Sequence, residues 1–256
     1  MIRRLVVVVL ALSGLLLADD GTKQVVQVTK TEHMAFPSGG VLRLTNSIGD
    51  LMVEGWDQPD MQITTTKSTK AEYDSGERER GAQELDQVRS AVKRDGNEIV
   101  IGTDFHRHRI FPHPFHAGTR FDLQYDIKVP RSAQLFIDHD DGDVYIDNVT
   151  GGIHVTVRKG QITLRLPEEG GYVIDARSKF GGVYSDFPGQ EERKLWFLGH
   201  EFTNPPSSRV RSGSLAGEKV SNPPSSAIPK LFLRVASGDI VIFKMTQPNI
   251  RPPLVQ

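Results

Sequence analysis

The chain has 256 residues, a formal net charge of −1 and no cysteine. A charge near zero gives no general attraction to nucleic acid or anionic lipid, and the lack of thiols excludes disulfides and lipid attachment through cysteine. The length fits one large all-β domain or two small ones. We therefore expect no nucleic-acid partner and a fold stabilised by burial and backbone pairing.

The N-terminal segment has the layout of a secretory signal peptide. Residues 1–4 include the basic pair Arg3 and Arg4, residues 5–17 are nearly all apolar, and Ala18 precedes Asp19. The apolar run is shorter than the about 20 residues that span a membrane. We expect residues 1–18 to be removed on export, which leaves no transmembrane span in the mature chain; a retained anchor or a buried strand is the alternative.

The next segments predict strands and then one helix. Residues 24–66 alternate apolar and polar side chains, as strands with one wet face do. Residues 98–101 return to this pattern. Between them the apolar spacing becomes helical, which predicts an amphipathic helix over about 79–92. The residues at helical spacing are Ala82, Leu85, Val88 and Val92.

A histidine-rich loop is expected over residues 104–119. Four of the eight histidines lie within eleven residues: His106, His108, His113 and His116. Neutral imidazoles at this density can ligate zinc, copper or nickel, so a site for a divalent transition metal is one interpretation. The other is a solvated loop, in which prolines separate the histidines and Arg107 and Arg109 oppose a dication.

Glycines recur at nearly constant spacing through the middle of the chain, and a short apolar-alternating run follows each of them. They are Gly142, Gly151, Gly160, Gly170 and Gly181, with outlying units at Gly49 and Gly238. One strand per unit with a turn glycine predicts a repeating β architecture. Because the outlying units extend the pattern to both ends, we expect one β-repeat domain over residues 19–243.

A second interruption covers residues 188–229. It contains the pentapeptide Asn-Pro-Pro-Ser-Ser twice, at 204–208 and 222–226. Such a polar stretch lacks the apolar surface that offsets ordering entropy, so a long mobile loop is expected, with one further strand at 195–198. Residues 244–256 form a Pro-rich tail.

Strands every nine to eleven residues fit a β-solenoid and a β-sandwich. The similar apolar set in each unit and the glycine just before each strand favour the solenoid, because like residues then stack along one interior. Neither observation excludes a sandwich of hairpins.

The motifs also resemble a known family. Residues 125–133, 135–146, 149–153 and 159–164, with the units beginning at Gly49 and Gly238, are similar to the bacterial "putative adhesin" domain, an exported β-repeat family of unknown function. The resemblance covers roughly residues 40–243 apart from 188–229. It implies a right-handed β-solenoid-like fold on the extracytoplasmic side, in the periplasm, at the cell surface or secreted. It carries no site residues.

Catalytic signatures are missing from the sequence. There is no Gly-x-Ser-x-Gly elbow, no phosphate-binding Gly-x-x-x-x-Gly-Lys-Ser/Thr and no His-Glu-x-x-His. Four carboxylates within 138–143 suit a turn better than a calcium loop, because the EF-hand spacing is not met. We therefore expect a non-enzyme without a cofactor, acting in cell-envelope interaction, adhesion or scaffolding with an envelope or surface partner. An envelope metal-binding protein that uses residues 106–116 is the alternative function, and a carbohydrate hydrolase is a third.

Overall fold

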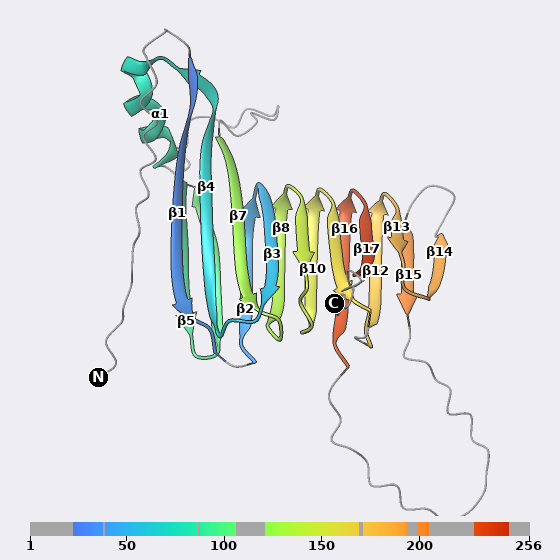
Figure 1. Cartoon of the computed structure of the whole chain (residues 1–256). Helices are drawn as coiled ribbons and strands as arrows, with labels where there is room; N and C mark the ends of the chain where they lie inside the picture. The colour runs from blue at the N-terminus through green and yellow to red at the C-terminus, as the bar shows by residue number, and fades with distance from the viewer. Residues whose placement is uncertain are drawn as a thin grey trace, which may run out of the picture.

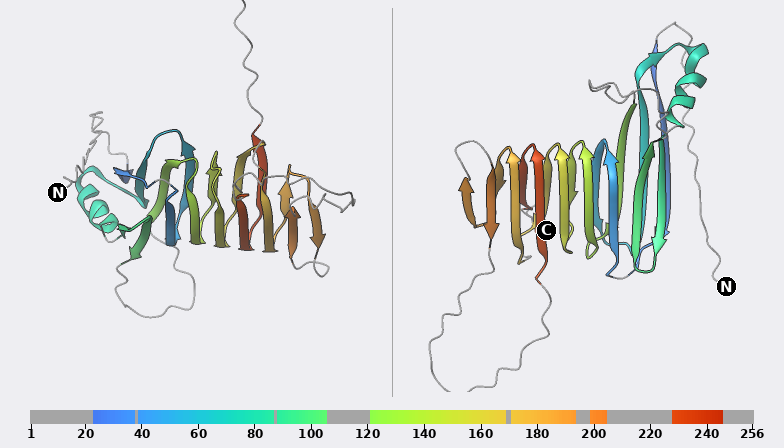
Figure 2. Two further views of the ribbon diagram at one scale, coloured as in Figure 1. Left: turned by 90° about the horizontal axis from the view of Figure 1, so that it is seen from below. Right: turned by 180° about the vertical axis from the view of Figure 1, so that it is seen from behind.

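The computed structural model describes residues 23–37, 39–86, 88–105, 121–168, 171–193, 199–204 and 228–245. These residues form two mixed β-sheets, one short 3-10 helix and one short α-helix, so the predicted all-β class is confirmed. The two sheets pack face to face as the two layers of an elongated body (Figures 1 and 2).

Sheet A has eight strands. In spatial order they are β1 (Gln24–Ala35), β4 (Asp60–Tyr73), β7 (Phe121–Pro130), β3 (Asp50–Trp56), β9 (Val144–Asp147), β11 (Ile162–Pro167), β17 (Ile240–Met245) and β13 (Val183–Ser185). Sheet B has nine: β14 (Gln190–Arg193), β15 (His200–Asn204), β12 (Val173–Phe180), β16 (Lys230–Ser237), β10 (Ile153–Lys159), β8 (Gln134–Asp141), β2 (Val41–Ile48), β6 (Glu98–Phe105) and β5 (Val88–Asp95).

Much of the chain runs back and forth between the sheets. In six pairs of consecutive strands, the first strand lies in sheet B and the second in sheet A. These pairs are β2–β3, β6–β7, β8–β9, β10–β11, β12–β13 and β16–β17. Neighbouring pairs are parallel in both sheets. Antiparallel strands flank them: β1, β4 and β5 at one end of the body, β14 and β15 at the other.

The order of the pairs in space differs from their order in the chain. The pair β16–β17 lies between β10–β11 and β12–β13, since β16 is parallel to both β10 and β12 and β17 to both β11 and β13. Figure 1 shows these strands in red among yellow and orange ones. The C-terminal pair therefore joins the β12–β15 end of the body to the rest.

The core lies between the sheets and consists of alternate residues from each strand. In sheet B one register row brings like side chains together across five strands: Leu42, Leu135, Ile153, Leu231 and Ile174, all at most 2% exposed. Fully burying an aliphatic side chain is worth about 1.5–3 kcal/mol. The apolar alternation of the sequence therefore becomes continuous columns of buried side chains.

The recurring glycines form a stack at one kind of turn, where the chain passes from sheet B to sheet A. A Cβ built on Gly142 would lie 2.2 Å from the carbonyl oxygen of Gly49, and one on Gly160 would lie 2.0 Å from that of Gly142. The same atom on Gly238 would lie 1.9 Å from the Gly160 oxygen, and on Gly181 2.0 Å from the Gly238 oxygen. Only glycine permits these backbones to approach so closely.

Gly151 belongs to the opposite kind of turn, from sheet A to sheet B. A Cβ there would meet the carbonyl oxygen of Ala133 at 2.0 Å, and Asn148, with φ of 57°, donates its side-chain amide to Gly55 O at 3.1 Å. The glycines that form one regular series in the sequence therefore lie at two different kinds of turn, at opposite ends of the strands. Gly170 lies outside the described residues.

The predicted helix over 79–92 is correct at its start and wrong beyond residue 85. A 3-10 turn, η1 (Ser75–Glu77), leads into α1 (Arg78–Leu85), and the chain then forms β5. Val88 and Val92, expected on the helix, pair with Phe105 and Ile101 of β6. β-Branched residues favour strands, and pairing with β6 outweighs the local helical spacing.

The predicted loop over 188–229 is also wrong in part. Strands β14 and β15 lie within it, and β15 pairs antiparallel with β12 at the end of sheet B. Phe202 of β15 is buried at 2% exposure, which gives this segment an apolar anchor. The strand expected at 195–198 lies outside the described residues.

Candidate functional site

The outer face of sheet A carries a row of mostly apolar and aromatic side chains, three of them exposed and three half-buried. The strand register aligns Met52, Tyr145, Thr163, Val241 and Tyr184 across five neighbouring strands. Met52 is 40% and Tyr184 59% exposed, and Phe243, two residues beyond Val241 on the same face, is 43% exposed. We call these six residues the outer row of sheet A. Strands stand about 4.8 Å apart, so the row extends roughly 19 Å.

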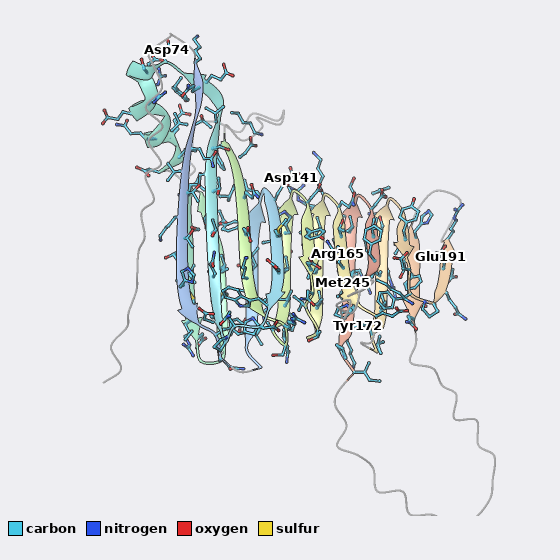
Figure 3. The ribbon with its side chains drawn as sticks, viewed as in Figure 1. Asp74, Asp141, Arg165, Tyr172, Glu191 and Met245 are labelled. Carbon is cyan, nitrogen blue, oxygen red and sulfur yellow. The ribbon has the colours of Figure 1, made fainter. Side chains whose placement is uncertain are left out.

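A charged row runs beside it on the same face. The register aligns Lys128, Glu54, Asp147 and Arg165. Lys128 Nζ lies 3.4 Å from Glu54 Oε2, and Arg165 Nε lies 3.7 Å from Asp147 Oδ1. Figure 3 labels Arg165 in the middle part of the body, between the ends marked by Asp74 and Glu191. The row thus has a cation at each end and the two carboxylates next to each other in the middle, and each carboxylate has a neighbouring cation.

Arg165 joins the two rows. Its Nη1 donates to the Tyr145 hydroxyl at 2.9 Å, and this bond, together with Asp147, raises the pKa of the guanidinium. Burial raises the pKa of Asp147; Arg165 opposes this effect and Glu54 adds to it. The hydroxyl of Tyr145 is therefore held in place by Arg165.

The outer face of sheet B carries a different ladder. His154 stacks between Phe136 and Phe232, with ring centroids 5.7 and 4.4 Å apart and interplanar angles of 20° and 22°. Arg43 lies over the Phe136 ring at 4.8 Å and Arg234 over the Phe232 ring at 3.6 Å. The faces of these rings are turned toward one another and toward guanidinium groups, so contacts within the molecule already occupy them.

The charges of this ladder are also paired within the chain. Arg234 Nη2 lies 2.7 Å from Asp175 Oδ2, and Arg177 bridges Asp175 at 3.1 Å and Glu201 at 2.9 Å. Burial of Asp175 opposes its ionisation, but the bonds and charges of Arg234 and Arg177 outweigh burial, so its pKa lies below the ordinary value. Burial, then Arg234 and Arg43, lowers the pKa of His154.

The two faces therefore differ in what they offer a partner. On sheet B the aromatic rings and charges bind one another across strands. On sheet A, Met52, Tyr184 and Phe243 keep 40–59% of their surface in water. Exposed apolar side chains gathered on one face commonly mark interaction sites, so the outer row of sheet A is the candidate functional site.

The metal site proposed from sequence is not tested by the structure. His106, His108, His113 and His116 all lie outside the described residues. Within the described ranges, no group of three or more His, Asp or Glu side chains could hold a metal ion. The strand register that aligns the outer row carried no signal in the sequence, because the row combines residues up to 191 positions apart, Met52 and Phe243.

The acidic segment 138–143 forms the end of a strand and a turn. Asp140 pairs with Arg158 at 3.3 Å, and Asp143 Oδ1 accepts the backbone N–H of Gln161 at 2.8 Å. Two other aspartates act in the same way along the glycine stack: Asp50 accepts from Asp143 N at 3.3 Å, and Asp239 accepts from Gly182 N at 2.7 Å. These carboxylates hold successive turns together, which supports the turn interpretation of the sequence.

Comparison with known proteins gave matches to solved structures alone. No family model and no curated protein sequence matches the chain. A "putative cell adhesion protein" from Clostridium sporogenes is 13% identical with a TM-score of 0.46, covering 85% of this chain and all of that one. A "putative adhesin" from Parabacteroides merdae is 11% identical with a TM-score of 0.25, covering 62% of this chain and 69% of that one. One from Bacteroides fragilis is 11% identical with a TM-score of 0.22, covering 88% and 99%.

Among the described residues, no helix has the length and apolar character needed to cross a membrane.

Proposed function

We propose that this chain is a non-enzymatic exported protein that acts in cell-envelope interaction, adhesion or scaffolding through the outer row of sheet A. The observation that carries the proposal is the exposure of Met52, Tyr184 and Phe243 on the outer face of sheet A. Extended repeat surfaces commonly bind through such faces rather than through pockets. The signal-peptide layout of residues 1–18 supports export to the periplasm, the cell surface or the medium.

We propose further that the two-sheet body is a right-handed β-solenoid-like stack, as the resemblance to the adhesin family implies. Alternation of successive strands between the sheets and parallel pairing in both sheets support a stack of coils. The antiparallel strands at both ends favour a sandwich instead. The hand of the connection from β8 through β9 to β10 in a crystal structure tests the proposal, and a left-handed path would contradict it.

The function is tested with isolated bacterial cell envelopes as the probe. The variant Met52→Ser/Tyr184→Ser/Phe243→Ser removes the exposed apolar surface, and we expect it to lower co-sedimentation with envelopes at least tenfold. The matched control is Phe180→Ser, an aromatic residue of sheet B that is 51% exposed. Equal sedimentation of the triple variant and the wild-type chain, with both folded by circular dichroism, would refute the proposal.

A metal-binding function remains a second proposal, supported by the density of histidines in residues 106–116. Calorimetric titration with zinc and with copper tests it. Binding that disappears in the His106→Ala/His108→Ala variant is expected. Absence of binding, or binding that this variant leaves unchanged, would remove the proposal.

A further inference from the structure

The two sheets have four edge strands, and three of them are protected against pairing. β13 has three residues, and β14 has four, with the sequence Gln-Glu-Glu-Arg. β5 has eight residues, of which Lys93 and Arg94 are basic and Asp95 is acidic. Short length and charged side chains are the usual means of blocking an edge, because they limit or oppose the addition of another strand.

The fourth edge, β1, lacks this protection. It has twelve residues, and its single partner among the described strands is β4. Val25 is 49% and Val28 42% exposed, and the two charges, Lys30 and Glu32, neutralise each other at 2.8 Å. Figure 1 shows β1 as the long outermost strand at the end of the body opposite β14. Its outward backbone N–H and C=O groups are available to another strand.

The helix α1 contacts one end of this strand. A Cβ on Gly81 would lie 2.7 Å from Val26 Cγ2, and Arg78 Nη2 donates to Gln24 Oε1 at 2.6 Å. These contacts involve residues 24–26 of β1. The segment of β1 from residue 27 to residue 35 therefore remains as an open edge of nine residues.

We propose that this edge pairs with β1 of a second copy of the chain, antiparallel, about a two-fold axis at Thr31. In this register Lys30 lies opposite Glu32 of the second copy, and Glu32 lies opposite the second Lys30. Val28 of each copy also lies opposite Met34 of the other copy. Both side chains are on the inner face of sheet A, as is Met61 of β4. Each cross-strand pair of opposite charges or apolar groups contributes about 0.2–1 kcal/mol, and the twofold symmetry doubles each contribution.

The neighbouring registers lack this complementarity. A two-fold axis perpendicular to the sheet leaves the inner faces of both copies on the same side. Inner-face residues must then lie opposite inner-face residues, so the axis passes between two copies of the same residue. An axis at Lys30 would place Lys30 opposite itself, and an axis at Glu32 would place Glu32 opposite itself. Like charges directly opposite destabilise a strand pair. An axis at Thr29 or His33 forms no ion pair, because Lys30 then faces Val28 or Phe36. The register at Thr31 is the one that pairs both charges.

A charge-reversal series tests the register on the full chain produced in an exporting host. The wild-type chain is expected to have twice the monomer mass by light scattering at micromolar concentration. Lys30→Glu and Glu32→Lys each place like charges opposite one another twice, and each is expected to raise the dimer dissociation constant at least tenfold. The double variant Lys30→Glu/Glu32→Lys restores both pairs and is expected to return the dissociation constant to within threefold of wild type. Lys93→Glu on the β5 edge is the control and should leave it unchanged.

A cysteine series gives an independent readout, since the chain has no native cysteine. Thr31→Cys places two thiols directly opposite, with Cα atoms about 4.5–5.5 Å apart, within the disulfide range. Ala35→Cys is the control, because eight residues of strand separate its two copies by roughly 27 Å. We expect a disulfide-linked dimer from the first variant and not from the second. A monomeric wild-type chain, a dimer that both single charge reversals leave intact, or equal cross-linking of the two cysteine variants would overturn the proposal.

Discussion

Gly238 illustrates how strongly single residues are constrained in the turns of this protein. Its φ is 135°, and a Cβ would lie 1.9 Å from the carbonyl oxygen of Gly160. We expect Gly238→Ala to lower the free energy of unfolding by about 2–4 kcal/mol, because both the dihedral angle and the backbone contact become strained. Gly102→Ala in β6, where a Cβ meets nothing within 4 Å, should change it by less than about 1 kcal/mol. Urea unfolding of both variants measures the difference, and equal losses would contradict the explanation.

Burial of His139 predicts that the stability of the protein depends on pH. Its side chain is 1% exposed, and burial lowers its pKa, although a bond with the Gly49 backbone and the charges of Asp140, Asp50 and Asp141 oppose this. Below the ordinary histidine pKa of about 6.5, the unfolded chain binds a proton that the buried imidazole does not. The free energy of unfolding should therefore fall as the pH drops below about 6.5.

The variant His139→Gln tests this dependence. It should lose less stability between pH 6.5 and pH 5 than the wild-type chain, as measured by urea unfolding at each pH. The control is His33→Gln, which removes an exposed histidine of β1 instead of the buried one. His154, whose pKa is also lowered, contributes in the same direction and remains in both variants. If His139→Gln follows the wild-type profile throughout, burial of this imidazole is not the cause.

At the scale of elements, the pair β16–β17 connects two parts of the body. Leu233 of β16 is 0% exposed and lies between Val155 of β10 and Ala176 of β12. Leu233→Ala should cost about 2–5 kcal/mol. Because β12 reaches the body through β16, hydrogen exchange should accelerate in β12 and β15 together with β16–β17. Leu135 in β8 is equally buried, so Leu135→Ala is the control. It should not accelerate hydrogen exchange selectively in β12 and β15. Uniform acceleration in both variants would contradict the connecting role of β16.

Local sequence patterns predict some strands and helices of this protein correctly and others wrongly. Alternation over residues 24–66 correctly indicates strands: β2, β3 and β4 each keep one face in the core, and β1 pairs with β4 although none of its residues is buried. The helical spacing of Val88 and Val92 is misleading, since their partners in β6 are supplied by the fold. Phe202 is likewise buried beside β12 although its neighbourhood is polar, so a loop was expected there. Pairing between distant segments outweighs local propensity in both cases.

At the scale of the whole molecule, export is the property to establish. The layout of residues 1–18 predicts cleavage after Ala18, so the protein recovered from cells that export it should begin at Asp19. Cell fractionation followed by N-terminal sequencing measures this. Recovery in the cytoplasm with Met1 intact would contradict the prediction. Mutation of residues 6–9 from valine to asparagine should block export, because it removes the apolar run.

The sequence alone determined the all-β class, the glycine turns and the alternation of core residues, because these depend on local geometry and on the period of a strand. It did not determine which strands are neighbours. The position of β16–β17 between β10–β11 and β12–β13, the outer row of sheet A and the open edge of β1 depend on the tertiary structure. Equivalent strands have the same local pattern, so pairing energies between distant segments, rather than propensity within each one, select the order in which they stack.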